Sequence, residues 1–215
     1  MDLFVRLSGR SAEEAFVAAR GIGSAAGFAV DVDLVTGIGP ALVSALDELG
    51  PVLVLAALVG PAPAVGAAAG RLARLGASWV TVSAMGGAAP VAAAVAAVSG
   101  TGCGIAATTL ATGLEPAEVA SLTGSTRGRL VSRLAEVAAG AGATGIIGTS
   151  ADLGVLAQVA PEVIRIVDAG PGAAEWAEAE RRGAGVLVLP DPEALGRFGA
   201  TGAAAAPPRA GKRRR

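Results

Sequence analysis

The stretch that decides the fold is PVLVLAALVGPAPAVGAAAGRLARLGASWVTVSAMGG, residues 51–87. Its apolar run at 52–59 lies between a proline and a glycine, a pattern typical of a strand buried on both faces. Small apolar residues at 64–75 predict a helix that ends at Gly76. The β-branched segment at 79–83 predicts the next strand. The stretch therefore predicts a strand, a helix and a second strand parallel to the first.

The same alternation of strand and helix continues along the whole chain. Strands are predicted at 3–7, 27–34, 52–59, 79–83, 102–109, 142–148, 162–167 and 185–189, with helical segments between them. This spacing predicts parallel pairing with right-handed crossovers. Eight units predict an α/β fold, a single closed (β/α)8 barrel of the TIM type, with an open doubly wound sheet as the alternative. We expect one domain over 1–200 and a disordered Ala/Pro/Arg tail over 201–215.

Composition limits the classes of protein to consider. The chain has 215 residues, of which 53% are hydrophobic and 16% charged, and its formal net charge is −1. Such a charge argues against a nucleic-acid partner, and the apolar stretches are too interrupted for a membrane span. The amino terminus leads directly into a strand without a signal-peptide layout, and the single cysteine, Cys103, reads as a small core residue. We therefore expect a cytoplasmic protein that does not bind membranes.

Two residue types that carry much of enzyme chemistry are almost absent. There is no histidine, and the only lysine is Lys212 in the tail. The fold therefore has no imidazole base, no histidine metal ligand and no lysine to donate a proton or form a Schiff base. The segments 21–23 and 37–39 resemble fragments of dinucleotide-binding loops but lack the full spacing. We expect no cofactor and no bound metal.

Taken in order with residues 51–87, two later segments carry a family resemblance. They are TTLATGLEPAEVASL (108–122) and RLVSRLAEVAAGAGATGIIGTS (129–150). A strand ending near threonine, a short acidic helix, a long helix and a strand ending in serine follow one another in the orotidine 5′-phosphate decarboxylase family. The chain resembles that family over residues 3–195. The resemblance implies a barrel of the predicted type and, by family class, a carbon–carbon lyase of pyrimidine biosynthesis.

The catalytic signature of that family is missing. Its third strand carries Asp-x-Lys-x-x-Asp, and the aligned residues here are Leu55, Ala57 and Gly60. These changes remove the proton donor and both carboxylates together. After the eighth strand the family has a Gly-Arg pair that holds phosphate, and here the sequence continues into Asp191. The resemblance therefore implies a degenerate member that has lost decarboxylation.

The other site positions carry over one at a time from the resemblance. The ligand-binding candidates are Ser8 after strand one, Asp31 in strand two, Ser83 at the end of strand four, Thr108 (or Thr109) in strand five, Ser150 after strand six, and Asp168 and Gly170 at the end of strand seven. We expect Ser8, Ala57, Ser83, Thr108 and Ser150 to ring one shallow pocket at the carboxyl ends of the strands.

The acidic candidates leave two interpretations open. Asp31 and Asp33 alternate on one predicted strand, so both are expected to point inward. With Asp168 they could form an oxygen-rich metal site; we favour an interior ion pair and a strand-end helix cap. Arg6 is the nearest inward cation, and we predict that it contacts Asp31 or Asp33, with Asp31 preferred. Ser83, Thr108 and Ser150 are likewise either ligand contacts or ordinary strand ends and N-caps.

Two functions follow as hypotheses. The first is a non-catalytic homologue that acts in binding or assembly, with a small-molecule ligand as a further partner. The second is a divergent lyase or decarboxylase of the pyrimidine or sugar-phosphate branch, which acts on a small ligand at the barrel mouth through Asp31, Asp33 and Asp168. Family dimers place the barrel mouths at the interface, so the resemblance also implies a homodimer.

Overall fold

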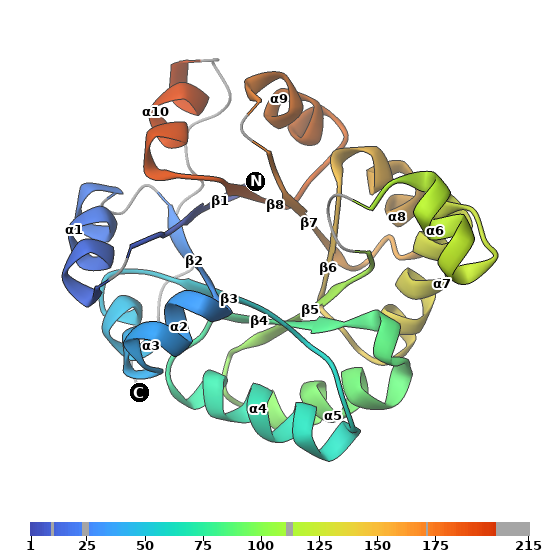
Figure 1. Cartoon of the computed structure of the whole chain (residues 1–215), viewed down its shortest axis with the longest axis horizontal. Coiled ribbons are helices and arrows are strands. Elements are labelled where there is room, and N and C mark those ends of the chain that lie inside the picture. Colours follow the sequence, from blue (N-terminus) through green and yellow to red (C-terminus); the bar gives the residue numbers. More distant parts are fainter. Residues whose placement is uncertain (10, 23–25, 111–113, 171, 201–215) are drawn as a thin grey trace.

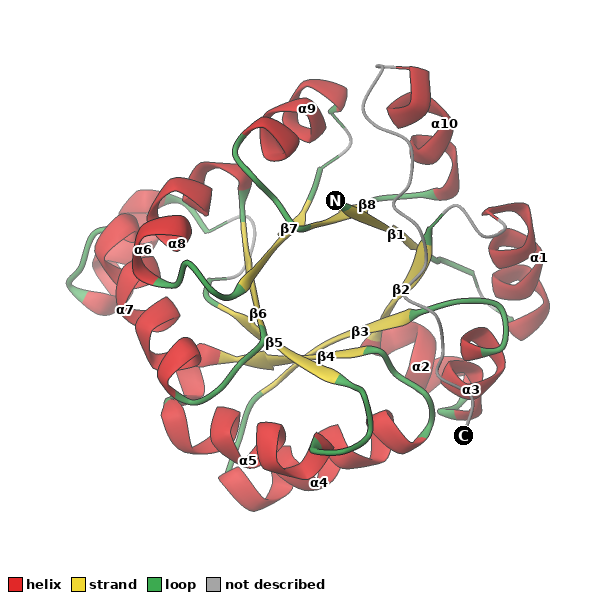
Figure 2. Cartoon of the chain, turned by 180° about the vertical axis from the view of Figure 1, so that it is seen from behind, coloured by secondary structure: helices red, strands yellow, loops and turns green. Residues whose placement is uncertain are grey.

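The computed structural model describes residues 1–9, 11–22, 26–110, 114–170 and 172–200. Residues 199 and 200 are described by their backbone only. The predicted tail, 201–215, lies outside the described residues. The chain forms a closed barrel of eight parallel strands in sequence order, ringed by helices (Figures 1 and 2). This confirms the predicted (β/α)8 fold and excludes the open sheet, because β1 pairs with both β2 and β8.

The strands are short, and most agree with the predicted segments to within a few residues. They are β1 (Asp2–Arg6), β2 (Gly27–Asp31), β3 (Val52–Leu58), β4 (Trp79–Ser83), β5 (Gly104–Thr108), β6 (Gly145–Gly148), β7 (Ile164–Asp168) and β8 (Val186–Leu189). The carboxyl ends of all eight strands open on the same side of the barrel, called the mouth below.

The helices form the outer layer. They are α1 (Ala12–Ile22), α2 (Val32–Ile38), α3 (Ala41–Asp47), α4 (Ala62–Arg74), α5 (Ala88–Val98), α6 (Pro116–Thr123), α7 (Arg127–Gly140), α8 (Leu153–Val159), α9 (Ala173–Arg181) and α10 (Pro192–Ala200), with 3-10 turns η1 (Ala84–Gly86) and η2 (Ser150–Asp152). None of the described helices is both long enough and apolar enough to cross a membrane.

The hydrophobic side chains separate into two layers, as the alternation of side chains along a strand requires. One layer fills the inside of the barrel and consists of Phe4, Ala29, Leu53, Ala106, Ile147, Ile166, Val186 and Val188, with Leu55 and Trp79 packed against them. The larger layer lies between the strands and the helices and includes the fully buried indole of Trp176. The core therefore fills the barrel below the mouth, and polar residues stand at the carboxyl ends of β1, β2, β4, β5 and β7.

Trp79 fills the amino end of the barrel because two glycines make room for its indole ring. A Cβ atom added to Gly104 would lie 2.6 Å from the ring, and one added to Gly145 would lie 2.8 Å from it. Real Cβ atoms do not approach other heavy atoms so closely. The first residues of β5 and β6 are thus glycines for a packing reason.

The predicted second strand is too long, and this moves one candidate residue. The alternation at 30–34, Val-Asp-Val-Asp-Leu, predicted a strand through residue 34, but β2 ends at Asp31 and α2 begins at the next residue. Asp31 has the extended backbone of an N-cap, and Leu34 and Val35 are buried on the following helix. Five alternating residues did not distinguish a strand from a strand end joined to a helical turn.

Candidate functional site at the barrel mouth

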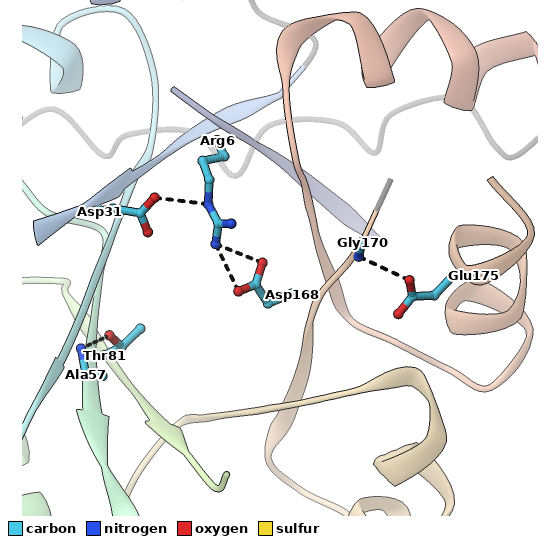
Figure 3. A network of polar contacts seen from close by, with 7 residues as sticks. All are labelled: Arg6, Asp31, Ala57, Thr81, Asp168, Gly170 and Glu175. Carbon is cyan, nitrogen blue, oxygen red and sulfur yellow. Dashed lines mark hydrogen bonds and ion pairs between the residues drawn. The ribbon is translucent and has the colours of Figure 1, made fainter. Parts of the chain in front are cut away.

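Arg6, the last residue of β1, is the centre of a polar network at the mouth (Figure 3). Its Nη2 donates to both carboxylate oxygens of Asp168 at 3.0 and 2.9 Å. Its Nε lies 3.2 Å from Oδ2 of Asp31. Within the described residues this buried Nε makes no hydrogen bond. Its contact with Asp31 is therefore an attraction between opposite charges, in which the N–H does not point at the carboxylate. The predicted contact between Arg6 and Asp31 is confirmed, and Asp168 is a second partner that was not predicted.

The network lies at the edge of the barrel interior and is partly open to solvent. The side chains of Arg6, Asp31 and Asp168 are 29%, 39% and 21% exposed. Burial raises the pKa of Asp31, and the Arg6 guanidinium lowers it. The carboxylates of Asp168 and Asp33 raise it as well, so the pKa of Asp31 lies above its ordinary value. Two carboxylates thus share one cation whose own charge is fixed at any ordinary pH.

Asp33 was predicted to point into the barrel beside Asp31, but it does not belong to this network. It lies in the first turn of α2, where it is exposed, and not on β2. Among the described residues, no three histidine, cysteine or acidic side chains are grouped so that they could hold a metal ion. The prediction that Asp31 and Asp33 both point inward is therefore wrong, and only Asp31 faces Arg6.

The end of β3, where the family signature would stand, departs from regular strand geometry. The register between β3 and β4 shifts between Val54 and Leu58. Within this irregularity Ala57 has a φ of 41°, a backbone conformation that costs a side-chain-bearing residue roughly 1–3 kcal/mol. Its amide donates to Thr81 Oγ1 at 2.7 Å (Figure 3). The local backbone is thus shaped around a hydrogen bond to the neighbouring strand.

The side chains of this segment carry no acid–base group. Leu55 packs against the core inside the barrel, whereas Ala56 and Leu58 pack against the outer layer. Ala57 between them belongs to neither layer and is exposed at the mouth. Gly60 has a φ of 145°, which residues with side chains rarely adopt. An aspartate at position 60 would therefore require a different backbone path.

The predicted hydroxyl candidates all lie at or just beyond the carboxyl ends of their strands. Ser83 and Thr108 are the last residues of β4 and β5 and are partners in the sheet register. Ser8 is exposed two residues beyond β1, and Ser150 begins η2. Within the described part of the chain, none of these four hydroxyl groups hydrogen-bonds to another protein group. Thr109 differs, because its hydroxyl is buried and donates to the Ile147 carbonyl at 3.1 Å.

Ser150 is not the N-cap that the sequence suggested. Thr149 occupies that position, and its backbone amide and hydroxyl donate to Asp152 Oδ2 at 3.0 and 2.8 Å. Arg127, at the start of α7, donates to the same carboxylate at 2.8 Å. Burial acts to raise the pKa of Asp152, but the hydrogen bonds from Arg127 and Thr149 outweigh it and lower the pKa below its ordinary value. This ion pair fixes α7 to the turn after β6.

Gly170 lies beyond β7 as expected and is held by α9. Its amide donates to Glu175 Oε2 at 3.1 Å (Figure 3), and its carbonyl accepts from Trp176 Nε1 at 2.8 Å. The Gly170 amide is therefore already occupied by a carboxylate. After β8, Asp191 accepts from the amide of Ala194 at 2.7 Å and pairs with Arg197 at 3.2 Å. Asp191 therefore has an arginine partner that the sequence did not reveal.

Cys103 lines a hollow of about 680 Å³ at the opposite, amino end of the barrel, together with Trp79 and Thr144. Burial raises the pKa of the Cys103 thiol to about 11. A thiol with so high a pKa is a poor nucleophile at neutral pH. Cys103 therefore contributes packing and no chemistry at the mouth.

Comparison with known proteins supports the fold. No protein-family model matches the chain. Among solved structures, orotidine 5′-phosphate decarboxylase from Lactobacillus acidophilus is similar with a TM-score of 0.82 and 19% identity, over 94% of this chain and 99% of that one. An uncharacterized conserved protein from Geobacillus kaustophilus is similar with a TM-score of 0.80 and 22% identity, over 92% of this chain and 98% of that one. At such identities the likeness establishes the barrel fold.

Proposed function

We propose that this chain is a homologue of orotidine 5′-phosphate decarboxylase that has lost decarboxylation and acts as a non-catalytic binding or assembly protein. The observation that carries the proposal is that the carboxylates of the protein itself already occupy the Arg6 guanidinium. It is the cation of the strand-end network and is bound by two carboxylates, Asp168 and Asp31. Beside it, β3 offers Leu55 and Ala57 in place of charged groups.

This arrangement opposes the chemistry of decarboxylation. A carbanion formed at the mouth would need a proton donor, and arginine does not release its proton at ordinary pH. Asp31 and Asp168 outnumber the one guanidinium, so an anionic substrate would meet net negative charge. Gly170, which the resemblance places near the ligand, gives its amide to Glu175. Each of these features favours loss of the reaction over its retention.

The test is a spectrophotometric assay with orotidine 5′-phosphate at neutral pH. We expect the loss of orotidylate absorbance to proceed at the rate of the buffer control. Restoring Leu55→Asp, Ala57→Lys and Gly60→Asp together should leave the protein inactive, because the phosphate-binding groups and the β3 backbone differ as well. Turnover by the unmodified protein above the buffer control would refute the proposal.

We also propose that the protein is a homodimer with its mouths at the interface. Val59 and Met85, at the ends of β3 and β4, are 69% and 53% exposed. Val59 lies against the turn that carries Met85, since Val59 Cγ2 is 3.8 Å from where a Cβ on the next residue, Gly86, would stand. Exposed apolar side chains that gather at a rim mark interaction surfaces.

Light scattering coupled to size-exclusion chromatography measures the mass of the assembly. We expect a dimer that Val59→Asp with Met85→Asp converts to a monomer. Val17→Asp is the matched control, because Val17 is 67% exposed on α1, away from the rim. A monomeric unmodified protein, or equal dissociation by the control, would refute the interface.

A divergent lyase is the second candidate, and Asp31 is the observation that favours it. Its carboxyl group has a raised pKa, is partly exposed, and lies beside a fixed cation. Such a group can exchange a proton with a bound ligand. A thermal-shift screen of small metabolites, with and without divalent metal, tests this candidate. A hit that Asp31→Asn abolishes and that is chemically converted on incubation would favour the lyase; binding without conversion would favour the non-catalytic homologue.

A further inference from the structure

A polar groove lies on the outside of the barrel, away from the mouth network. It measures about 870 Å³ and is lined by the α6–α7 turn, one side of α7 and the facing side of α8. These three helices lie together at one edge of the molecule (Figures 1 and 2). The volume falls in the range of small-molecule sites.

Two arginines of α7 line this groove without partners. Arg129 and Arg133 are both exposed and stand four residues apart, so they share one side of the helix. Within the described residues neither guanidinium makes an ion pair or hydrogen bond. Glu136 lines the same groove yet lies beyond ion-pair distance of both. Arg127, two residues earlier, is by contrast fully engaged by Asp152.

The remaining lining adds hydrogen-bond donors. Ser132 lies between the two arginines in sequence, is half-buried, and its hydroxyl has no partner within the described part of the chain. Gln158 of α8 supplies an exposed amide on the other side of the groove. Gly128 has no heavy atom within 4 Å of where a Cβ would stand, so the start of α7 is open to an approaching ligand.

Two like charges held four residues apart repel each other, and an anion between them would relieve that repulsion. Guanidinium groups bind phosphoryl oxygens in a forked geometry, and a hydroxyl and an amide could satisfy further oxygens. We propose that this groove, centred on Arg129, Arg133 and Ser132, binds the phosphoryl group of a small anionic ligand. The proposal does not depend on the chemistry of the mouth.

Isothermal titration calorimetry at low ionic strength tests the site, with inorganic pyrophosphate as the probe. We expect saturable binding that Arg129→Gln with Arg133→Gln weakens at least about tenfold. The matched control is Arg71→Gln with Arg74→Gln, which removes two charges from the end of α4 and should change the affinity less than about twofold. Both double variants should fold, because all four arginines lie exposed on helices.

Further titrations define the ligand class. Binding of ADP more tightly than pyrophosphate would assign the phosphoryl group to a nucleotide, and the reverse order would assign it to a free phosphate; either supports the site. Citrate, a carboxylate anion, should bind more weakly than pyrophosphate. Absence of pyrophosphate binding, equal weakening by both double variants, or equal binding of citrate would overturn the proposal.

Discussion

Replacing Arg6 with methionine tests whether one guanidinium holds the ends of β1, β2 and β7 together. Methionine keeps most of the length of the side chain and removes the charge. The lost bonds are the pair to Asp168 at 3.0 and 2.9 Å and the charge contact to Asp31 at 3.2 Å. Removing one partner of a fully buried ion pair costs about 3–5 kcal/mol of the free energy of unfolding. Because these three side chains are 21–39% exposed, solvent screening lowers the expected loss to about 2 kcal/mol.

The loss should also depend on pH. Arg6 holds down the pKa of Asp31 against burial and the neighbouring carboxylates, so its removal raises that pKa further. A group whose pKa is raised in the folded state destabilises the fold as pH rises through that value. The free energy of unfolding of Arg6→Met should therefore fall furthest below that of the unmodified protein at neutral pH, and the difference should shrink in acid.

Urea denaturation followed by circular dichroism at neutral and at acidic pH measures both effects. For a chain of this length, a loss of about 2 kcal/mol corresponds to a melting temperature lower by about 4–8 °C. Arg197→Met is the matched control, because its pair with Asp191 is 49% and 41% exposed and should contribute less than about 1 kcal/mol. An Arg6→Met variant no less stable than the control, or a deficit that grows in acid, would refute this account of the mouth.

Two further substitutions test the outer layer and the barrel core. Asp152→Asn should lower the free energy of unfolding by about 2–3 kcal/mol at neutral pH, because it leaves a half-buried arginine without its carboxylate. The lowered pKa of Asp152 means that its contribution is present above pH 3.8 and is lost as pH falls through the folded-state pKa, so denaturation curves of the two proteins should converge in strong acid. Gly104→Ala should cost about 1–3 kcal/mol, since its Cβ would lie 2.6 Å from the Trp79 ring. Gly154→Ala, with no heavy atom within 4 Å of the added Cβ, should be neutral or stabilising in the same urea denaturation experiment, and equal losses in both alanine variants would contradict the packing argument.

Local patterns predicted the barrel well because each strand is short, apolar and followed by a helix. The predicted strand 79–83 agrees with β4 at both ends. Prediction was wrong where the local pattern fitted two structures: the alternation around Asp31 continued into α2, which moved Asp33 from a strand to a helix. Similarly, Thr149 and Ser150 are adjacent hydroxyl residues after β6, and only the position of Asp152 makes Thr149 the cap.

The candidate site was predictable in part: Asp31 and Asp168 were grouped from the sequence, and the arginine that joins them was predicted for Asp31 alone. Arg6 and Asp31 lie on adjacent strands and follow from the inward face of each, so that contact could be predicted. Asp168 lies 162 residues from Arg6 and comes within reach because the barrel closes through β8. Arg127 and Asp152 are 25 residues apart on separate outer elements, and nothing in local periodicity indicates which arginine a buried carboxylate will meet.

The indole of Trp79, seated against Gly104 and Gly145, restricts the order in which this barrel can change over evolution. While the tryptophan is present, a side chain at either glycine meets its ring and the variant is selected against. Once a smaller residue replaces the tryptophan, alanine at either glycine no longer meets the ring, and the return to tryptophan becomes the costly step. The three positions, on three consecutive strands, should therefore be inherited as a set, and homologues with a side chain at 104 or 145 should have a smaller residue at 79.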